Sequence, residues 1–118
     1  MARLLIVEDE WLIAAEYAFL LRNAGHSVSG PFARVAPALE AIEKDDINAA
    51  LLDVNLGKDN SFPVARSLQT RGIPFAFLAG HADREELAAF GPTPVLTKPV
   101  APEALLAILQ KLCPPDPR

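Results

Sequence analysis

Short apolar runs alternate along this chain with longer segments in which apolar residues recur every three or four positions. A short apolar run bounded by turn residues is typical of a buried strand, and the longer period is typical of a helix that packs on one face. Strands that alternate with helices predict a parallel sheet covered by helices. The expected strands are residues 3–7, 26–30, 48–53, 75–78 and 94–96, and the expected helices are residues 10–23, 35–44, 63–70 and a last one that starts at Pro102.

The helical segments also carry packing and boundary signals. In the first helix, Ile13, Tyr17 and Leu20 share one face at helical spacing. Pro63 opens the third helix, because the first turn does not need the N–H that proline lacks. Residues 83–90 are soon followed by a glycine and two prolines, which break the pattern. We therefore expect a short or irregular fourth helix there.

The second expected strand contains only one large apolar residue, Val28, so it suits an edge of the sheet. Right-handed crossovers then favour a five-stranded parallel sheet with the flavodoxin-like order 2-1-3-4-5 and helices on both faces. We expect a single α/β domain over residues 1–113. Residues 114–118 form a proline-rich tail that cannot continue the last helix.

Charged residues follow three of the expected strands at the point where each ends. Asp53 ends the most apolar strand, Glu8 and Asp9 follow the first, and Lys98 follows the fifth. Sites in open parallel sheets form beyond the carboxyl ends of the strands. Because an isolated ionised carboxylate is costly to bury, Asp53 requires a partner at this edge.

These residue types together indicate phosphoryl transfer. Three neighbouring carboxylates must take up protons or bind a cation, and Mg²⁺ is commonly held by carboxylates with room left for a phosphate oxygen. The backbone carbonyl of Asn55 could add a ligand to Glu8, Asp9 and Asp53. Lys98 supplies a compact cation for a phosphoryl oxygen, and Asp53 is the candidate nucleophile.

Composition narrows the classes of partner. The chain has 118 residues, 51% of them hydrophobic, and its fifteen acids and eleven bases give a net charge of −4. Without a basic patch, direct binding to nucleic acid or to an anionic membrane surface is not expected. The single cysteine, Cys113, cannot form an internal disulfide, and there is no signal peptide or membrane-length apolar run. These features favour a cytoplasmic location.

Three motifs at the strand ends carry a family resemblance. They are Leu-Ile-Val-Glu-Asp-Glu at residues 5–10, Leu-Leu-Asp-Val-Asn-Leu at residues 51–56 and Thr-Lys-Pro at residues 97–99. In this order and spacing, the sequence resembles a response regulator receiver domain of the chemotaxis-regulator type over essentially its whole length. The resemblance implies a stand-alone phosphoprotein of two-component signalling, with no separate enzymatic output.

Each site residue takes its expected role from this resemblance. Asp53 would accept a phosphoryl group from a histidine kinase or a histidine phosphotransfer protein. Glu8, Asp9 and Asp53 would hold Mg²⁺ together with the Asn55 carbonyl, and Lys98 would contact the phosphoryl group. The protein would then signal to a downstream protein partner.

Two positions depart from the receiver pattern. Ala79 stands where receivers usually place a threonine or serine whose hydroxyl bonds the phosphoryl group, and Val95 falls near the position of a switch aromatic residue. Residues 71–77, with Gly80, also resemble a subgroup of single-domain receivers in alphaproteobacteria that is named for a Phe-Ala-Thr-Gly-type motif. Here Leu78 and Ala79 replace Ala-Thr, so altered switching is expected.

Other functions are weighed against the same residues. A pseudo-receiver that binds partners without phosphorylation is the main alternative, and Ala79 and Val95 motivate it. An enzyme with an aspartyl-phosphate intermediate is less favoured, because such enzymes need a second acid where this chain has Asn55. A flavodoxin is disfavoured because its first loop would be rich in hydroxyls and glycine rather than acidic.

Overall fold

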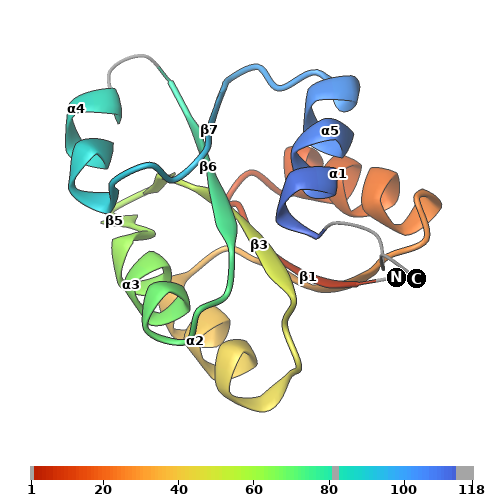
Figure 1. Cartoon of the computed structure of the whole chain (residues 1–118), viewed down its shortest axis with the longest axis horizontal. Coiled ribbons are helices and arrows are strands. Elements are labelled where there is room, and N and C mark those ends of the chain that lie inside the picture. Colours follow the sequence, from red (N-terminus) through yellow and green to blue (C-terminus); the bar gives the residue numbers. More distant parts are fainter. Residues whose placement is uncertain (1, 81–82, 114–118) are drawn as a thin grey trace.

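A five-stranded parallel sheet runs through the middle of the molecule (Figure 1). This computed structural model describes residues 2–80 and 83–113, so the predicted tail at residues 114–118 lies outside the described residues. The sheet order is β2-β1-β3-β6-β7. The strands are Arg3–Val7 (β1), Ser27–Phe32 (β2), Ala49–Asp53 (β3), Phe75–Ala79 (β6) and Val95–Thr97 (β7). All four neighbouring pairs are parallel.

The predicted order 2-1-3-4-5 is confirmed, and β2 lies at an edge as expected. Only the numbering differs, because a small antiparallel hairpin that the sequence analysis did not foresee follows β3. Its strands are Asn55–Leu56 (β4) and Asp59–Asn60 (β5). The hairpin forms a separate two-stranded sheet, so β6 and β7 are the fourth and fifth strands of the main one.

Helices cover both faces of the sheet (Figure 1). Helices α1 (Trp11–Asn23) and α5 (Pro102–Leu112) pack on one face, and α2 (Val35–Lys44) and α3 (Phe62–Thr70) pack on the other. Successive strand residues point to opposite faces. Because helices cover both faces, the strand residues that point to either face are apolar. Each central strand is therefore a continuous hydrophobic run in the sequence.

The buried stripe of helix α1 is shifted by about one residue from the predicted one. Ile13 and Leu20 are only half-buried, although Tyr17 is buried. Alanines bring the helix backbone close to the sheet because they have no bulk to hold it away. The buried residues of α1 are Ala14, Tyr17, Ala18 and Leu21.

The fourth helix is short, as predicted. Helix α4 (Arg84–Leu87) has four residues and continues into a 3-10 turn, η2 (Ala88–Phe90). Phe90 is buried, and its ring centroid lies 5.0 Å from that of Phe62 and 5.2 Å from that of Phe77. The aromatic contacts anchor this segment against α3 and β6.

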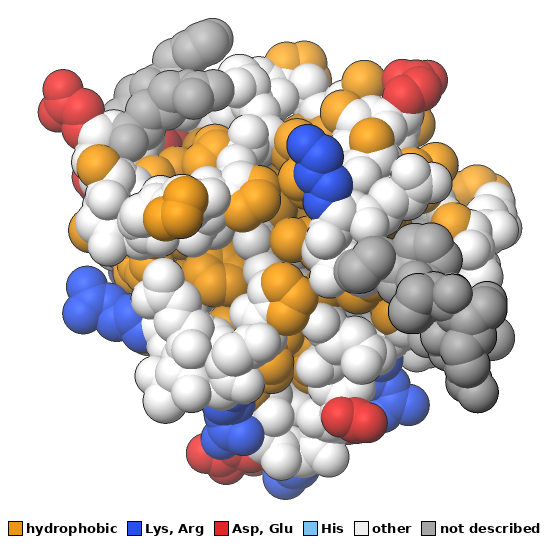
Figure 2. All heavy atoms as spheres, in the orientation of Figure 1, with side chains coloured by type: hydrophobic (Ala, Val, Ile, Leu, Met, Phe, Trp, Pro, Cys, Tyr) orange, Lys and Arg blue, Asp and Glu red, His pale blue; other side chains and the backbone are white. Residues whose placement is uncertain are grey.

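Strand β7 forms the other edge of the sheet, and its three residues are half-buried. Figure 2 shows the molecule in the orientation of Figure 1, and apolar side chains are visible on its surface between polar and charged ones. Within residues 2–80 and 83–113, no helix has the length and apolar character needed to cross a membrane.

Strand β2 runs to Phe32, two residues past its predicted end, and this extension helps to position the first acidic turn. Gly30 has a φ of 100°, and an added Cβ there would lie 2.8 Å from the Phe32 backbone nitrogen. The Phe32 carbonyl then accepts a hydrogen bond of 2.9 Å from the Glu8 backbone N–H. The end of β2 thus fixes the backbone of Glu8.

Candidate functional site

The three predicted carboxylates lie together at the carboxyl ends of β1 and β3. Val7 pairs with Leu52 in the parallel register, so Glu8 lies beside Asp53. One carboxylate oxygen from each of Glu8, Asp9 and Asp53 lies within 4.8 Å of the other two. Glu8 and Asp53 are buried, with 2% and 5% of their surface exposed, whereas Asp9 is exposed.

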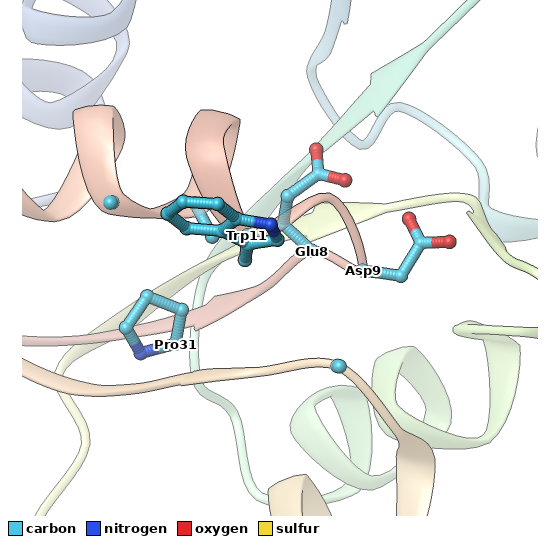
Figure 3. Close-up of a pocket in the computed structure, with 7 residues that line it drawn as sticks. Glu8, Asp9, Trp11 and Pro31 are labelled. Carbon is cyan, nitrogen blue, oxygen red and sulfur yellow. The ribbon is translucent and has the colours of Figure 1, made fainter.

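The turn between β1 and α1 orients the Glu8 side chain. The Glu10 backbone N–H donates a hydrogen bond of 3.2 Å to Glu8 Oε2. Figure 3 shows the Glu8 and Asp9 carboxylates pointing away from the indole ring of Trp11, which lies along the start of α1. The acids therefore face the sheet edge rather than the exposed side of the helix.

Lys98 joins this cluster from the end of β7. Its backbone N–H donates to the Ala79 carbonyl at 2.9 Å, which continues the pairing of β6 with β7. Its Nζ lies 2.8 Å from Asp53 Oδ2 and 3.3 Å from Glu8 Oε1. One ammonium group thus pairs with both buried carboxylates, which offsets part of the cost of their burial.

This arrangement changes the protonation of two of its members. Burial raises the pKa of the Glu8 carboxyl from 4.5 to about 7, and the nearby Asp53 carboxylate adds to the rise. Burial alone would lower the pKa of Lys98, but the hydrogen bond and charge of Asp53, with the charge of Glu8, raise it above its ordinary value. Lys98 is therefore a cation at neutral pH, while Glu8 exchanges its proton near neutrality.

The donor set fits a hard divalent cation. Carboxylate oxygens are the ligands that Mg²⁺ prefers, and it usually retains several waters. The exposed position of Asp9 leaves the cluster open to solvent on one side. Asn55, two residues after Asp53, begins β4, and its role as a carbonyl ligand remains a prediction.

Comparison with known proteins shows to which family this chain belongs. The family model of the response regulator receiver domain matches residues 4–110. This chain belongs to that family. Receiver domains are the signalling modules of two-component response regulators, and the strand-end acids and lysine lie within the matched region.

Individual relatives agree with this assignment. The receiver domain is 31% identical to the sensory transduction protein LytT of Bacillus anthracis, over 94% of this chain and 47% of LytT. It resembles the solution structure of SdrG from Sphingomonas melonis Fr1, with 39% identity, a TM-score of 0.82, and coverage of 95% and 96% of the two chains. It also resembles the response regulator PhyR from Brucella abortus, with 30% identity, a TM-score of 0.80, and coverage of 94% and 47%. The chain thus spans about half the length of LytT and PhyR.

The two unusual positions of this receiver lie on neighbouring strands. Ala79 ends β6, is buried, and pairs in register with Thr97. Val95 begins β7, pairs with Phe77, and packs against the core on the side of α2 and α3. A methyl group and an aliphatic side chain therefore occupy these places, and their effect on switching remains a prediction.

The sequence analysis missed one polar residue of the site edge, Asp83. Its Oδ1 accepts a hydrogen bond of 3.0 Å from the Asn55 side-chain amide, and its Oδ2 accepts one of 3.1 Å from the Gly80 backbone N–H. Aspartate is common just before a helix, which was the available signal. Its partner Asn55 is 28 residues away in the sequence, so only the fold reveals the contact.

A shallow pocket of about 200 Å³ lies on the α1 side of the acidic turn (Figure 3). Trp11 is 76% exposed, and Pro31 lies across the pocket from it. The lining residues are Glu8, Asp9, Trp11, Ala14, Ala15, Pro31 and Ala33. The exposed apolar surface of α1 therefore begins directly beside the acids.

Proposed function

We propose that this receiver domain accepts a phosphoryl group on Asp53 from a phosphohistidine of a histidine kinase or a histidine phosphotransfer protein. The observation that carries the proposal is the pairing of Lys98 Nζ with Asp53 Oδ2 at 2.8 Å, beside two further carboxylates. A buried acid held by a lysine at the end of a central strand is a suitable acceptor, because the developing negative charge meets a fixed cation.

The transfer is a substitution at phosphorus. An oxygen of the Asp53 carboxylate forms a bond to phosphorus while the phosphorus–nitrogen bond of phosphohistidine breaks, and the imidazole leaves with the electron pair. The protein contributes mainly position and charge, as is general for phosphoryl transfer. Lys98 would shift from the carboxylate toward the oxygens of the incoming group, since its side chain is 28% exposed and flexible.

Glu8, Asp9 and Asp53 would hold Mg²⁺, with the Asn55 carbonyl as a further ligand. The ion would neutralise charge on the phosphoryl oxygens. Metal ligation requires ionised carboxylates. The pKa of Glu8 near 7 therefore makes this residue the one whose proton must leave.

The proposed partners are proteins, namely the phosphodonor and a downstream target, rather than nucleic acid. The net charge of −4 supports this choice, since nucleic-acid binding needs a basic surface. A cytoplasmic location belongs to the same proposal, because reduced thiols are normal there and Cys113 has no cysteine partner within the chain.

Intact-protein mass spectrometry tests phosphoryl acceptance directly. The protein is incubated with Mg²⁺ and acetyl phosphate, beside Asp53→Asn and the matched surface control Asp59→Asn. We expect the wild type and Asp59→Asn to gain the mass of one phosphoryl group and Asp53→Asn to gain none. The proposal fails if the wild type gains no mass, or if Asp53→Asn gains as much.

A phosphorylation-independent binding module is the second candidate, and Ala79 favours it, because a hydrogen bond that switches most receivers has no donor there. A pull-down with the wild type, with and without acetyl phosphate, and with Asp53→Asn separates the two. Partners that depend on phosphorylation support the switch. The same partners in all three samples would support the binding module.

A further inference from the structure

The Asp83 carboxylate bridges two chain segments beside the phosphoacceptor. Asp53 pairs with Leu78 in the register of β3 and β6. Asn55 and Gly80 therefore stand at equivalent places, each two residues beyond this pair. Asp83 accepts a hydrogen bond from both of them, at 3.0 and 3.1 Å. Its carboxylate thus links the residues that follow the ends of β3 and β6.

This carboxylate accepts a hydrogen bond from the residue that follows Ala79, the position at which this receiver lacks the usual hydroxyl. Ala79 offers only a methyl group as its side chain, and the next backbone donor is the N–H of Gly80, directly after β6. That donor is already taken by Asp83 Oδ2. An added Cβ at Gly80 would lie 3.8 Å from Asp83 Oδ2, an ordinary van der Waals distance, so the carboxylate lies directly against this residue.

A phosphoryl group on Asp53 would bring a second anion to this edge. Such a group carries a charge of about −1.5 to −2 and three strong acceptor oxygens. Phosphoryl oxygens and the Asp83 carboxylate seek the same N–H donors and repel one another. The two anions cannot both be well satisfied by the Gly80 amide.

We propose that Asp83 is a positioning residue that competes with the phosphoryl group, holding the Gly80 amide and the Asn55 side chain until phosphorylation of Asp53 displaces it. This inference rests on the proposed function. In this mechanism, phosphorylation of Asp53 acts on the start of α4 by breaking a carboxylate contact. It does not act by forming a new contact with a hydroxyl.

The test compares Asp83→Asn with Glu86→Gln. Asparagine has the shape of aspartate and can still accept from the Gly80 N–H, while the Asn55 amide can turn to present its oxygen, so the change removes mainly the charge. Glu86 is an exposed acid on the same short helix, and Glu86→Gln controls for loss of one negative charge. Urea unfolding of each variant checks that the fold is retained.

Binding of beryllium trifluoride, an acyl-phosphate analogue, in saturating Mg²⁺ is followed by amide NMR. We expect Asp83→Asn to bind the analogue about twofold to fivefold more tightly than the wild type, because a partly exposed repulsion is removed. Glu86→Gln should bind like the wild type. A merely structural role of Asp83 would not raise affinity, since damage to the fold weakens a site.

The outcomes separate this inference from the proposed function. Tighter binding by Asp83→Asn alone supports both. Binding by Asp83→Asn when the wild type binds none overturns both, because phosphorylation could then not displace Asp83 in the wild type. If the wild type binds and Asp83→Asn binds equally or more weakly, the competition model is wrong and the proposed function stands. If neither protein binds the analogue, both ideas are overturned.

Discussion

Replacing Glu8 by glutamine should remove most of a pH dependence of stability that originates in the acid cluster. The Glu8 side chain is 0% exposed and lies 3.3 Å from Lys98 Nζ. Burial, with the Asp53 carboxylate nearby, raises the pKa of Glu8 from 4.5 to about 7. The folded protein therefore keeps this proton over a pH range in which the unfolded chain has lost it.

The sign and size of this pH dependence follow from the linkage between proton binding and folding. Between pH 4.5 and about 7 the folded state binds one proton more than the unfolded state at Glu8, so the free energy of unfolding falls as pH rises. The slope is about 1.4 kcal/mol for each pH unit. Over this range the contribution of Glu8 amounts to about 3 kcal/mol, fully present below pH 4.5 and lost as pH rises through 7.

Urea unfolding of the wild type and Glu8→Gln, measured from pH 4.5 to 8 in EDTA, tests this reasoning. Other carboxylates titrate in both proteins, so the informative quantity is the difference between the two free energies of unfolding. We expect the wild type to lose about 3 kcal/mol relative to Glu8→Gln as pH rises. A difference that stays constant with pH would show that Glu8 is ionised in the folded protein throughout.

Two further substitutions test the packing of charges and polar groups. Lys98→Met leaves Asp53 and Glu8 without their cation and should lower the free energy of unfolding at pH 8 in EDTA by about 2 kcal/mol. Part of this loss should be recovered in Mg²⁺. Equal stability of Lys98→Met and the wild type would contradict the pairing. Ser61→Ala should stabilise the protein by about 1 kcal/mol, because Ser61 Oγ is buried without a hydrogen-bond partner among the described residues. Both are measured by urea unfolding, and a less stable Ser61→Ala would point to an unseen partner for the hydroxyl.

The sequence determined the fold and the neighbourhood of the site for a local reason. Short apolar runs indicate the buried strands and a period of three to four indicates the helices, and a parallel sheet gathers the residues that follow its strands at one edge. Asp53, Glu8 and Lys98 each follow an apolar run, so their meeting could be predicted from the chain alone. Pro63 and Pro102 likewise marked helix starts without any tertiary information.

Only the tertiary structure decided how those side chains are paired and protonated. The sequence predicted that Lys98 contacts a phosphoryl group, and only the structure showed that its ammonium pairs with both Asp53 and Glu8. The pKa of Glu8 depends on its burial, and the Asp83 contact joins residues from separate strand ends. These interactions depend on atomic positions to within a few tenths of an ångström and on the exclusion of water. Neither can be predicted from the local order of residues.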